Sequence, residues 1–489
     1  MTAKHIIVVG GGNAGFCAAL AAHDAGASVT VLERAPKALA GGNSAFTAGL
    51  MRCAFDGVDD IDAIVELSDE QKRTTEFGSY SAQAFYEDLG RITEYKCDPD
   101  LAHGLTFKSH ETLVWMKEHG IKFDAAYGRQ AFNVDGRFTF WGGVVIETVG
   151  GGPGLVEGLT NEAKKLGIEV LYNARAEQLH RGDDGIEGVT ARIEGKTTRL
   201  DADAVVLAAG GFQANPEMRT RYLGPGWDLA KVRGTRYNTG DGIRMAMEVG
   251  GSSAGNWSGC HAVGWDQNAP EFGDLAVGDG FQKHSYPFGL IVNAEGERFV
   301  DEGADFRNYT YAKYGRRVLE QTHQFAWQIF DSKVTHLLRD EYKIRQVTKV
   351  SADTIEELAA KLEGVDASAF LDTIAEYNAS IDQSVAFNPN ELDGRATAGI
   401  TPPKSNWANT IADGPFEAYA ITCGITFTFG GVRINGNAEV LDDGGDPVPG
   451  LYAAGEMAAG IFYFNYPGGS GLTAGSVYGR IAGARAGQA

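Results

Sequence analysis

The chain has 489 residues, of which 43% are hydrophobic, and a formal net charge of −21. At about 150 residues per domain, this length predicts two or three domains with ample core. The acidic surplus and the lack of a basic run exclude nucleic acid and anionic membrane surfaces as expected partners. An anionic substrate would therefore need local Arg or Lys groups to hold it.

The cysteines and the start of the sequence indicate the cellular compartment. The five cysteines form no Cys-x-x-Cys pair and no ladder of close spacings. We therefore expect a reduced, cytoplasmic protein without zinc, iron–sulfur or other metal ligation. The first residues lack the layout of a secretory signal, and no run approaches about 18 apolar residues. Export and direct membrane insertion are both unexpected.

The first predicted elements form a phosphate-binding turn. A strand-like run, residues 5–9, leads into Gly10, Gly12 and Gly15, and a helix-like run, residues 16–22, follows. These glycines have the G-x-G-x-x-G spacing, which permits a tight turn, a close approach to a pyrophosphate and close packing of helix on strand. The helix N-terminus offers free N–H groups and the positive end of a dipole. The segment predicts a dinucleotide-binding site.

The next strand indicates which dinucleotide is excluded. Residues 27–32 end on Glu33, roughly 20 residues beyond the glycines, where a carboxylate can accept both hydroxyls of an adenosine ribose. That carboxylate would repel a 2′-phosphate, so NADP is disfavoured.

A second glycine-rich turn weakens the case for a nicotinamide cofactor. Gly150–Gly154 lies between a strand-like run, 144–149, and a helix-like run, 155–166. A proline stands where the helix should begin, and the following strand, 168–172, ends in Asn173 instead of an acid. We expect a packing or active-site turn here. NAD(P)H is then no obvious electron donor.

Three further segments favour FAD. Gly41–Ser44 supplies small residues and polar donors where the pyrophosphate and ribityl chain of a long cofactor would run. Residues 204–211 read as a buried parallel strand that ends on paired glycines. The strand-like run 450–456 ends in Glu456, a carboxylate suited to a polyol, and residues 467–475 open the last helix. A helix N-terminus beneath a flavin pyrimidine would stabilise the negative charge of the reduced ring.

At these segments the chain resembles the fumarate reductase and succinate dehydrogenase flavoproteins, and among them the FAD-dependent tricarballylate dehydrogenases. The resemblance implies an α/β fold: a Rossmann-like FAD-binding domain of the GR2 type, interrupted by a mobile α+β capping domain. We place the FAD-binding domain at 1–250 and 416–489 and the cap at 251–415, with the active site between them. The motifs that carry the resemblance are Gly10–Gly15, Gly41–Ser44 with Ala48 and Gly49, Thr239–Gly242, Gly296–Glu302, Phe427–Gly431 and Asn465–Gly469.

The resulting cofactor prediction is FAD. The residues expected to bind it are Gly10, Gly12, Asn13, Ala14, Gly15, Glu33, Arg34, Gly41, Gly42, Asn43, Ser44, Thr47, Ala48, Gly49, Ala176, Ala209, Gly210, Asp241, Gly455, Glu456, Ser470, Gly471 and Leu472.

Departures from the fumarate reductase pattern carry functional information. The resemblance places Phe427 where those enzymes have a substrate-binding His, and Tyr466 where they have an Arg. Membrane-bound members attach FAD through a His in the segment that matches Gly41–Ser44, and this segment has none, so FAD should be noncovalent. Tricarballylate dehydrogenases are similar to this chain at Phe427–Gly431 and Asn465–Gly469.

The implied chemistry removes two hydrogens from a CH–CH unit beside a carboxylate. A hydride goes to flavin N5 and a base takes the α proton, which is acidic enough only if cations bind the carboxylate. Glu302 and Arg307 match the proton-transfer pair of fumarate reductases. A surface ion pair between Arg298 and local acids is the alternative interpretation. The base stays open, with Tyr466 and Tyr309 as candidates if a cation lowers the phenol pKa.

Four residues are further candidates for substrate binding: Arg52, Thr428, His261 and His284. Arg52 could equally be a surface charge, and a lone His is more often a structural hydrogen bonder. The aromatic stretch 461–466 suits core or flavin-edge packing, or a pocket for a ring-bearing substrate such as a ketosteroid.

Three functional hypotheses follow. The first is oxidation of a polycarboxylate, tricarballylate to cis-aconitate, with reoxidation of the flavin by a membrane-associated iron–sulfur protein. The second is dehydrogenation or reduction of an apolar or ring substrate, or a fumarate reductase-like reduction of an unsaturated acid. The third is a flavin-bound sensor or assembly subunit without turnover.

Overall fold

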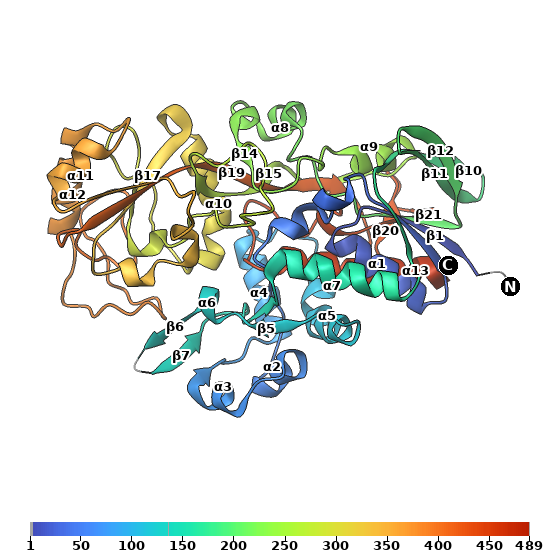
Figure 1. The fold of residues 1–489 in the computed structure, drawn as a ribbon, viewed down its shortest axis with the longest axis horizontal. Coiled ribbons are helices and arrows are strands. Elements are labelled where there is room, and N and C mark those ends of the chain that lie inside the picture. Colours follow the sequence, from blue (N-terminus) through green and yellow to red (C-terminus); the bar gives the residue numbers. More distant parts are fainter. Residues whose placement is uncertain (1–2, 135, 489) are drawn as a thin grey trace.

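A computed structural model describes residues 3–134 and 136–488. Both chain ends lie beside the first sheet at one end of the long axis, and helices α11 and α12 lie at the other end (Figure 1). Segments from the first 150 residues form a further lobe below these two (Figure 1).

The first sheet is a parallel sheet with one antiparallel edge strand. Its order is β20-β21-β13-β1-β2-β9, and only β20 runs antiparallel to its neighbour. The strands come from both ends of the chain, as the sequence predicts for a divided dinucleotide-binding domain. Their bounds are β1 His5–Val9, β2 Ser28–Leu32, β9 Glu169–Leu171, β13 Ala204–Leu207, β20 Glu439–Leu441 and β21 Pro447–Ala453.

Helices from the two chain ends pack against each other beside this sheet. Helix α1 spans Asn13–Asp24 and α13 spans Ser470–Gln488. A Cβ at Gly479 would lie 2.4 Å from the Ala14 carbonyl oxygen, and one at Gly483 would lie 2.0 Å from that of Ala18. Glycines on α13 therefore permit the two helix backbones to touch. This close packing joins the N-terminal and C-terminal parts of the domain in one core.

Helix α7, Gly151–Lys165, begins inside the second glycine-rich segment. A Cβ at Gly152 would lie 2.1 Å from the Ser44 carbonyl oxygen, and one at Gly154 would lie 1.9 Å from that of Val149. Gly152 thus packs the helix against the turn η2, Gly42–Phe46, and Gly154 permits the tight turn after Val149, as expected for a packing turn. The helix starts earlier than the hydrophobic pattern predicts.

Two groups of smaller elements complete this half of the molecule. A three-stranded antiparallel sheet, β10-β11-β12, lies beside the first sheet together with α9, and α8 lies above β14 and β15 (Figure 1). Residues 50–134 and 136–148 supply the elements of the lower lobe (Figure 1). The former elements are β10 Ala174–Gly182, β11 Gly185–Ile193, β12 Lys196–Asp201, α8 Pro216–Leu223 and α9 Asp241–Glu248. The latter are β3 Leu50–Met51, α2 Val58–Val65, α3 Asp69–Thr74, β4 Thr75–Glu76, α4 Ala82–Ile92, α5 Pro99–Glu118, β5 Phe123–Ala125, α6 Tyr127–Gln130, β6 Ala131–Val134, β7 Arg137–Phe140 and β8 Ile146–Thr148.

The second large sheet is organised by one long strand that follows the predicted cap, 251–415, in the sequence. The cap itself supplies β15, β16, β17 and β18, whereas β14 and β19 come from outside its bounds. Strand β19, Phe416–Val432, pairs with β14, β15, β17 and β18. Its first half packs in the distal core, and its second half joins the core of the first sheet. The boundary expected at 415/416 thus falls where this strand begins. The other elements are β14 Lys231–Val232, β15 Ser253–Asp266, β16 Leu290–Val292, α10 Tyr311–Leu319, β17 Phe325–Phe330, β18 Lys349–Ala352, α11 Ile355–Lys361 and α12 Ala367–Ala379.

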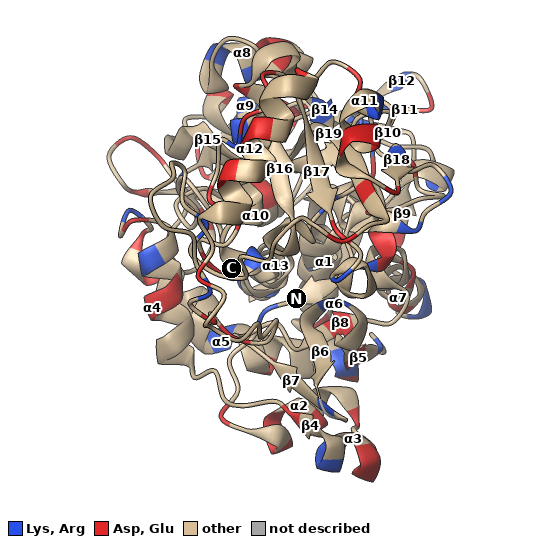
Figure 2. Cartoon of the chain, turned by 90° about the vertical axis from the view of Figure 1, so that its left-hand side faces the viewer, with Lys and Arg blue, Asp and Glu red and all other residues tan. Residues whose placement is uncertain are grey.

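Charges are spread over the surface in mixed order. Helices such as α3 and α4 carry both acidic and basic residues (Figure 2). Among residues 3–134 and 136–488, no helix is both long and apolar enough to cross a membrane.

Candidate active site

A single elongated cavity connects the glycine turn of the first sheet with the second sheet. Its empty space, part of it open to solvent, measures about 1980 Å3. Residues from the first sheet, the lower lobe and the cap all line it. A concave site at a domain junction is the usual place for a cofactor and its substrate.

The glycine turn is tightly packed at Gly10 and open toward the cavity at Gly12, where a pyrophosphate would lie. Gly10 has φ +114°, and a Cβ there would lie 2.3 Å from the Ala208 carbonyl oxygen. A Cβ at Gly12 would meet nothing closer than Ser44 Oγ at 3.5 Å, so this position faces the cavity. The N-terminus of α1 opens at the same point. The turn therefore fits a pyrophosphate.

Glu33 closes the adjacent end of the cavity. Its Oε2 accepts the Gly11 backbone N–H at 2.9 Å and its Oε1 accepts that of Ala35 at 2.7 Å. Burial raises the pKa of this carboxyl above its ordinary value. Beside it, Arg34 pairs with Asp241 at 2.7 Å. The acid stands where the ribose hydroxyls of an adenosine would donate hydrogen bonds.

Glu456 occupies the corresponding position at the end of β21. Its Oε1 accepts the Thr428 backbone N–H at 2.9 Å, and its Oε2 accepts Gln213 Nε2 at 3.1 Å. Burial raises the pKa of Glu456 to about 7. The carboxyl lines the cavity between the glycine turn and the second sheet. Hydroxyls of a ribityl chain are suitable donors for it, so the residues present fit FAD.

Most predicted cofactor residues line the cavity. Four support its wall from behind: Gly15, Gly41, Gly49 and Ser470 are not part of the lining. A Cβ at Gly15 would lie 1.9 Å from the Gly10 carbonyl oxygen, so its role is packing within the turn. The residues that line the cavity are Gly10, Gly12, Asn13, Ala14, Glu33, Arg34, Gly42, Asn43, Ser44, Thr47, Ala48, Ala176, Ala209, Gly210, Asp241, Gly455, Glu456, Gly471 and Leu472.

The cap end of the cavity carries buried polar groups without protein partners. Both ring nitrogens of His261, Nε2 of His284 and the Nε atoms of Arg233 and Arg307 have no hydrogen-bond partner among the described residues. All four side chains line the cavity. Buried polar atoms are normally paired, so this end is built to be completed by a polar ligand.

The ionisation of this end follows from burial. Burial, and secondarily Arg233, lowers the pKa of both His261 and His284 well below its usual value. The imidazoles are therefore neutral near pH 7. Burial, and then Tyr466, raises the pKa of Tyr311 well above its usual value, which keeps the phenol protonated. Burial lowers the pKa of the Arg307 guanidinium, and neighbouring Arg129 adds to that fall.

Aromatic rings form the rest of this wall. The ring of His261 lies 4.9 Å from that of Tyr311, 5.3 Å from Phe427 and 4.8 Å from Tyr466. Phe427 and Phe462 each pack 5.3 Å from the Tyr466 ring, edge to face. Thr428, a predicted substrate-binding residue, also lines the cavity, and its backbone holds Glu456. Of the predicted aromatic stretch 461–466, Ile461, Phe462 and Tyr466 line the cavity, whereas Phe464 is exposed.

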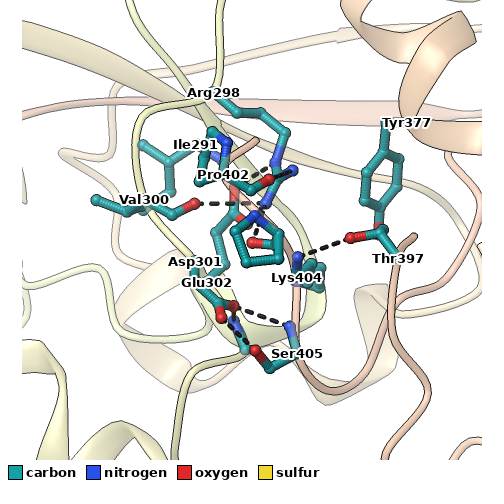
Figure 3. A network of polar contacts seen from close by, with 12 residues as sticks. Ile291, Arg298, Val300, Asp301, Glu302, Tyr377, Thr397, Pro402, Lys404 and Ser405 are labelled. Carbon is teal, nitrogen blue, oxygen red and sulfur yellow. Dashed lines mark hydrogen bonds and ion pairs between the residues drawn. The ribbon is translucent and has the colours of Figure 1, made fainter. Parts of the chain in front are cut away.

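The expected pairing of Glu302 with Arg307 is not present. Glu302 is fully buried outside the cavity wall, where its Oε2 accepts Arg298 Nη2 at 2.5 Å and its Oε1 accepts the Ile291 N–H at 2.9 Å (Figure 3). The guanidinium of Arg307 instead donates from Nη2 to the Arg129 carbonyl oxygen. The alternative ion pair with Arg298 does form, but in the interior and not at the surface.

Two further predicted site residues, Arg52 and Tyr309, lie outside the cavity lining. Arg52 is completely buried; its Nε donates to the Gly468 carbonyl oxygen at 2.8 Å, and its Nη1 donates to Tyr309 Oη at 3.2 Å. The Tyr309 hydroxyl donates to Asp88 Oδ2 at 2.6 Å. Neither residue lines the cavity, so the two tie the lower lobe to the cap. Tyr466 lines it, and its hydroxyl accepts the Gly469 N–H at 2.9 Å.

Sequence reasoning missed several residues of the cap end, among them Arg129, Gln130, Arg233, Gln282, Asn308 and Tyr311. Asn308 and Tyr311 follow Arg307 closely, so the same motif could have indicated them. Arg233 stands six residues before the Thr239–Gly242 motif. Nothing local distinguishes Arg129 from a surface arginine.

The divided parallel sheet, the acid-flanked glycine turn and the cavity beside them are the features of an FAD-binding flavoprotein. The comparisons agree: residues 5–472 match the FAD binding domain family, to which the chain belongs. It is 30% identical to a probable fumarate reductase, Ifc3, of Shewanella frigidimarina over 98% of this chain and 74% of the relative.

Two solved structures show the same fold. The open conformation of a flavocytochrome c3 fumarate reductase superposes with a TM-score of 0.73 at 27% identity, over 99% of this chain and 78% of that one. A 3-ketosteroid Δ1-dehydrogenase from Sterolibacterium denitrificans superposes with a TM-score of 0.74 at 21% identity, over the whole of both chains. The protein is accordingly an FAD-dependent oxidoreductase of the fumarate reductase family.

Proposed function

We propose that this chain oxidises a CH–CH unit beside a carboxylate to an alkene, with tricarballylate as substrate and cis-aconitate as product. The observation that carries the proposal is the partnerless Nε of Arg307 at the cap end of the cavity, beside the polar rings of His284 and Tyr311. FAD, held noncovalently by the glycine turn, Glu33 and Glu456, supplies the hydride acceptor.

Arg307 is the proposed proton carrier. Its Nη2 bond to the Arg129 carbonyl oxygen fixes the guanidinium, and Nε stays free toward the cavity. Burial lowers its pKa, so the neutral guanidine that can accept the α proton is more accessible than in water. In the reverse reaction the guanidinium returns that proton to the alkene carbon. Tyr311 is less suited as the base because its raised pKa keeps it protonated.

The neutral histidines hold and orient the acid. A neutral imidazole donates one N–H, and His261 and His284 both have a free nitrogen at the cavity. Hydrogen bonds to a carboxylate that strengthen as charge builds at the α carbon lower the barrier to proton removal. Phe427, Phe462 and Tyr466 exclude water from the same space.

The motifs Phe427–Gly431 and Asn465–Gly469 favour tricarballylate over other acids. A ring substrate is the second candidate, because the aromatic wall offers flat apolar surface at the cap end. Reduction of an unsaturated acid, as the name of the Shewanella relative indicates for that protein, would use the same groups in the opposite direction. A membrane-associated iron–sulfur protein as electron acceptor, and a cytoplasmic location, complete the proposal.

Anaerobic mixing tests the reaction directly. Purified holoprotein is mixed with tricarballylate, succinate or a ketosteroid, and bleaching of the flavin band is followed. Bleaching by tricarballylate with formation of cis-aconitate supports the proposal; bleaching by the steroid alone supports the ring hypothesis, and bleaching by none of these contradicts both.

Variants of Arg307 test the proton carrier. Arg307→Gln should slow bleaching by roughly 10²–10⁴-fold, the usual contribution of a general base, while substrate still binds. Arg345→Gln, which removes an exposed arginine of the same lobe, is the control and should have no effect. Equal rates in both variants would exclude Arg307 from proton transfer.

A further inference from the structure

Arg233 stands at the cap end of the cavity without a role in the proton transfer described above. It follows β14 directly, and its backbone N–H donates to the Ile425 carbonyl oxygen of β19 at 2.8 Å. Only 7% of the residue is exposed. Its Nη1 donates to Thr426 Oγ1 at 3.3 Å, and its Nε is buried without a partner. The backbone therefore fixes a desolvated cation with unused donors.

Arg233 is a buried arginine of the cavity wall without a carboxylate partner. Arg219 and Arg339 are buried without one as well, but they donate to backbone carbonyl oxygens and lie outside the cavity lining. By contrast, Arg298 pairs with Glu302 at 2.5 Å, and Arg129 forms a bidentate ion pair with Asp279 at 3.0 Å. No described carboxylate lies within 4.0 Å of the Arg233 guanidinium. An isolated buried charge is costly, so such a group is usually matched by a counter-ion.

The neighbours of Arg233 give it no compensation. His261 and His284 carry no charge near pH 7, and Tyr311 is protonated. Arg307, on η5, Arg307–Tyr309, lines the same cavity and is another basic group, so it supplies no negative charge. Arg129 is neutralised by Asp279, and Glu341 is the largest charge that favours the Arg307 guanidinium. Arg233 therefore keeps an unmatched charge when His261 and His284 hold the carboxylate at the reacting carbon.

We propose that Arg233 is a specificity-determining residue that binds a second carboxylate of the substrate, so that this cavity selects acids with at least two carboxylates. The proposal rests on the proposed function and narrows its substrate class. A guanidinium suits the task because its planar donors match both oxygens of a carboxylate. Monocarboxylates, which leave Arg233 unmatched, should bind weakly.

Binding without turnover tests this assignment. Oxidised holoprotein is titrated by calorimetry with malonate, a dicarboxylate that lacks a CH–CH unit to oxidise, and with acetate; tricarballylate and succinate are compared as substrates. The variants are Arg233→Gln, Arg233→Lys and the control Arg236→Gln, which removes an exposed arginine that stacks on Phe272. The flavin content and unfolding temperature of each variant are measured alongside.

The wild type should bind malonate at least tenfold more tightly than acetate. Arg233→Gln should weaken malonate binding and raise the KM for tricarballylate by at least tenfold each, with less than a threefold effect on acetate. Arg233→Lys should restore part of the loss, and Arg236→Gln should match the wild type. Equal losses for malonate and acetate, or no loss, in a flavin-loaded Arg233→Gln protein would overturn the assignment, as would a wild type without preference for malonate.

These outcomes separate the two proposals. A wild type that binds malonate through Arg233 but is not reduced by any acid would refute the proposed reaction and retain the anion site. A wild type that oxidises tricarballylate with a KM independent of Arg233 would retain the reaction and refute the site.

Discussion

The variant Glu302→Gln tests whether Glu302 stabilises the fold or takes part in catalysis. The Arg298 and Glu302 side chains are 4% and 0% exposed, and the network that they form also reaches Lys404 (Figure 3). Burial lowers the pKa of Lys404 to about 8, and Glu302 is the largest influence that opposes this fall. Glu302→Gln would leave Arg298 buried without a counter-charge. Removing one partner of a buried ion pair costs about 3–5 kcal/mol, so the free energy of unfolding of the cap should fall by that amount.

The assay combines unfolding and kinetics. Urea unfolding of the holoprotein gives the stability change, and the rate of flavin bleaching at several pH values gives the catalytic change. We expect a large loss of stability and, below the unfolding transition, a bleaching rate within a few-fold of the wild type with the same pH profile. Glu295→Gln, which changes an exposed acid seven residues earlier in the chain, should alter neither. An unchanged stability with a bleaching rate reduced by roughly 10²-fold or more would place Glu302 in the proton path and refute this reasoning.

Two further variants test the cofactor end. Gly10→Ala should abolish FAD binding, measured as the flavin-to-protein ratio, because its Cβ would lie 2.3 Å from the Ala208 carbonyl oxygen and its φ of +114° disfavours alanine; a normal ratio would contradict the described turn. Glu456 has a pKa raised by burial from 4.5 to about 7, so it stabilises the folded apoprotein fully below about pH 4.5, and this contribution of up to ~3 kcal/mol is lost as the pH rises to 7. Glu456→Gln should remove that part of the pH dependence of urea unfolding, and parallel pH curves for the two proteins would show that Glu456 is ionised normally.

The cofactor end could be predicted from the sequence because each of its parts is local. Gly10, Gly12 and Glu33 belong to one strand–turn–helix–strand unit, and the backbone of that unit alone determines how they lie. Glu456 follows a strand of the same sheet, so parallel pairing brings it to the edge where β1 and β2 end. The lower lobe had no comparable motif. Its short strands pair across large sequence separations, and the alternation of apolar residues did not reveal them.

The pairing of Glu302 could not be read from spacing. Arg298 and Arg307 lie four and five residues away from it, and both are plausible partners on that ground. In the structure Glu302 pairs with Arg298 and not with Arg307, because Gly303 packs against the backbone of Asn406. A Cβ at Gly303 would lie 2.2 Å from the Asn406 carbonyl oxygen. The chain therefore turns away after Glu302, and Arg307 enters the cavity on a different face. A close backbone contact made by a residue about 100 positions later determined the outcome.

The cap end illustrates why charge compensation is a better guide to a ligand site than residue type. Its lining comes from α6, the turn after β14, β15, η5 and β19, so no motif contains it. Within the described part of the chain, Arg34, Arg129 and Arg298 each face a carboxylate, and their charges are balanced by the protein. Arg233 and Arg307 have free Nε atoms in the same cavity. Since a protein gains nothing in stability from a desolvated cation without a partner, the uncompensated Arg233 is best explained by a ligand that brings the missing negative charge.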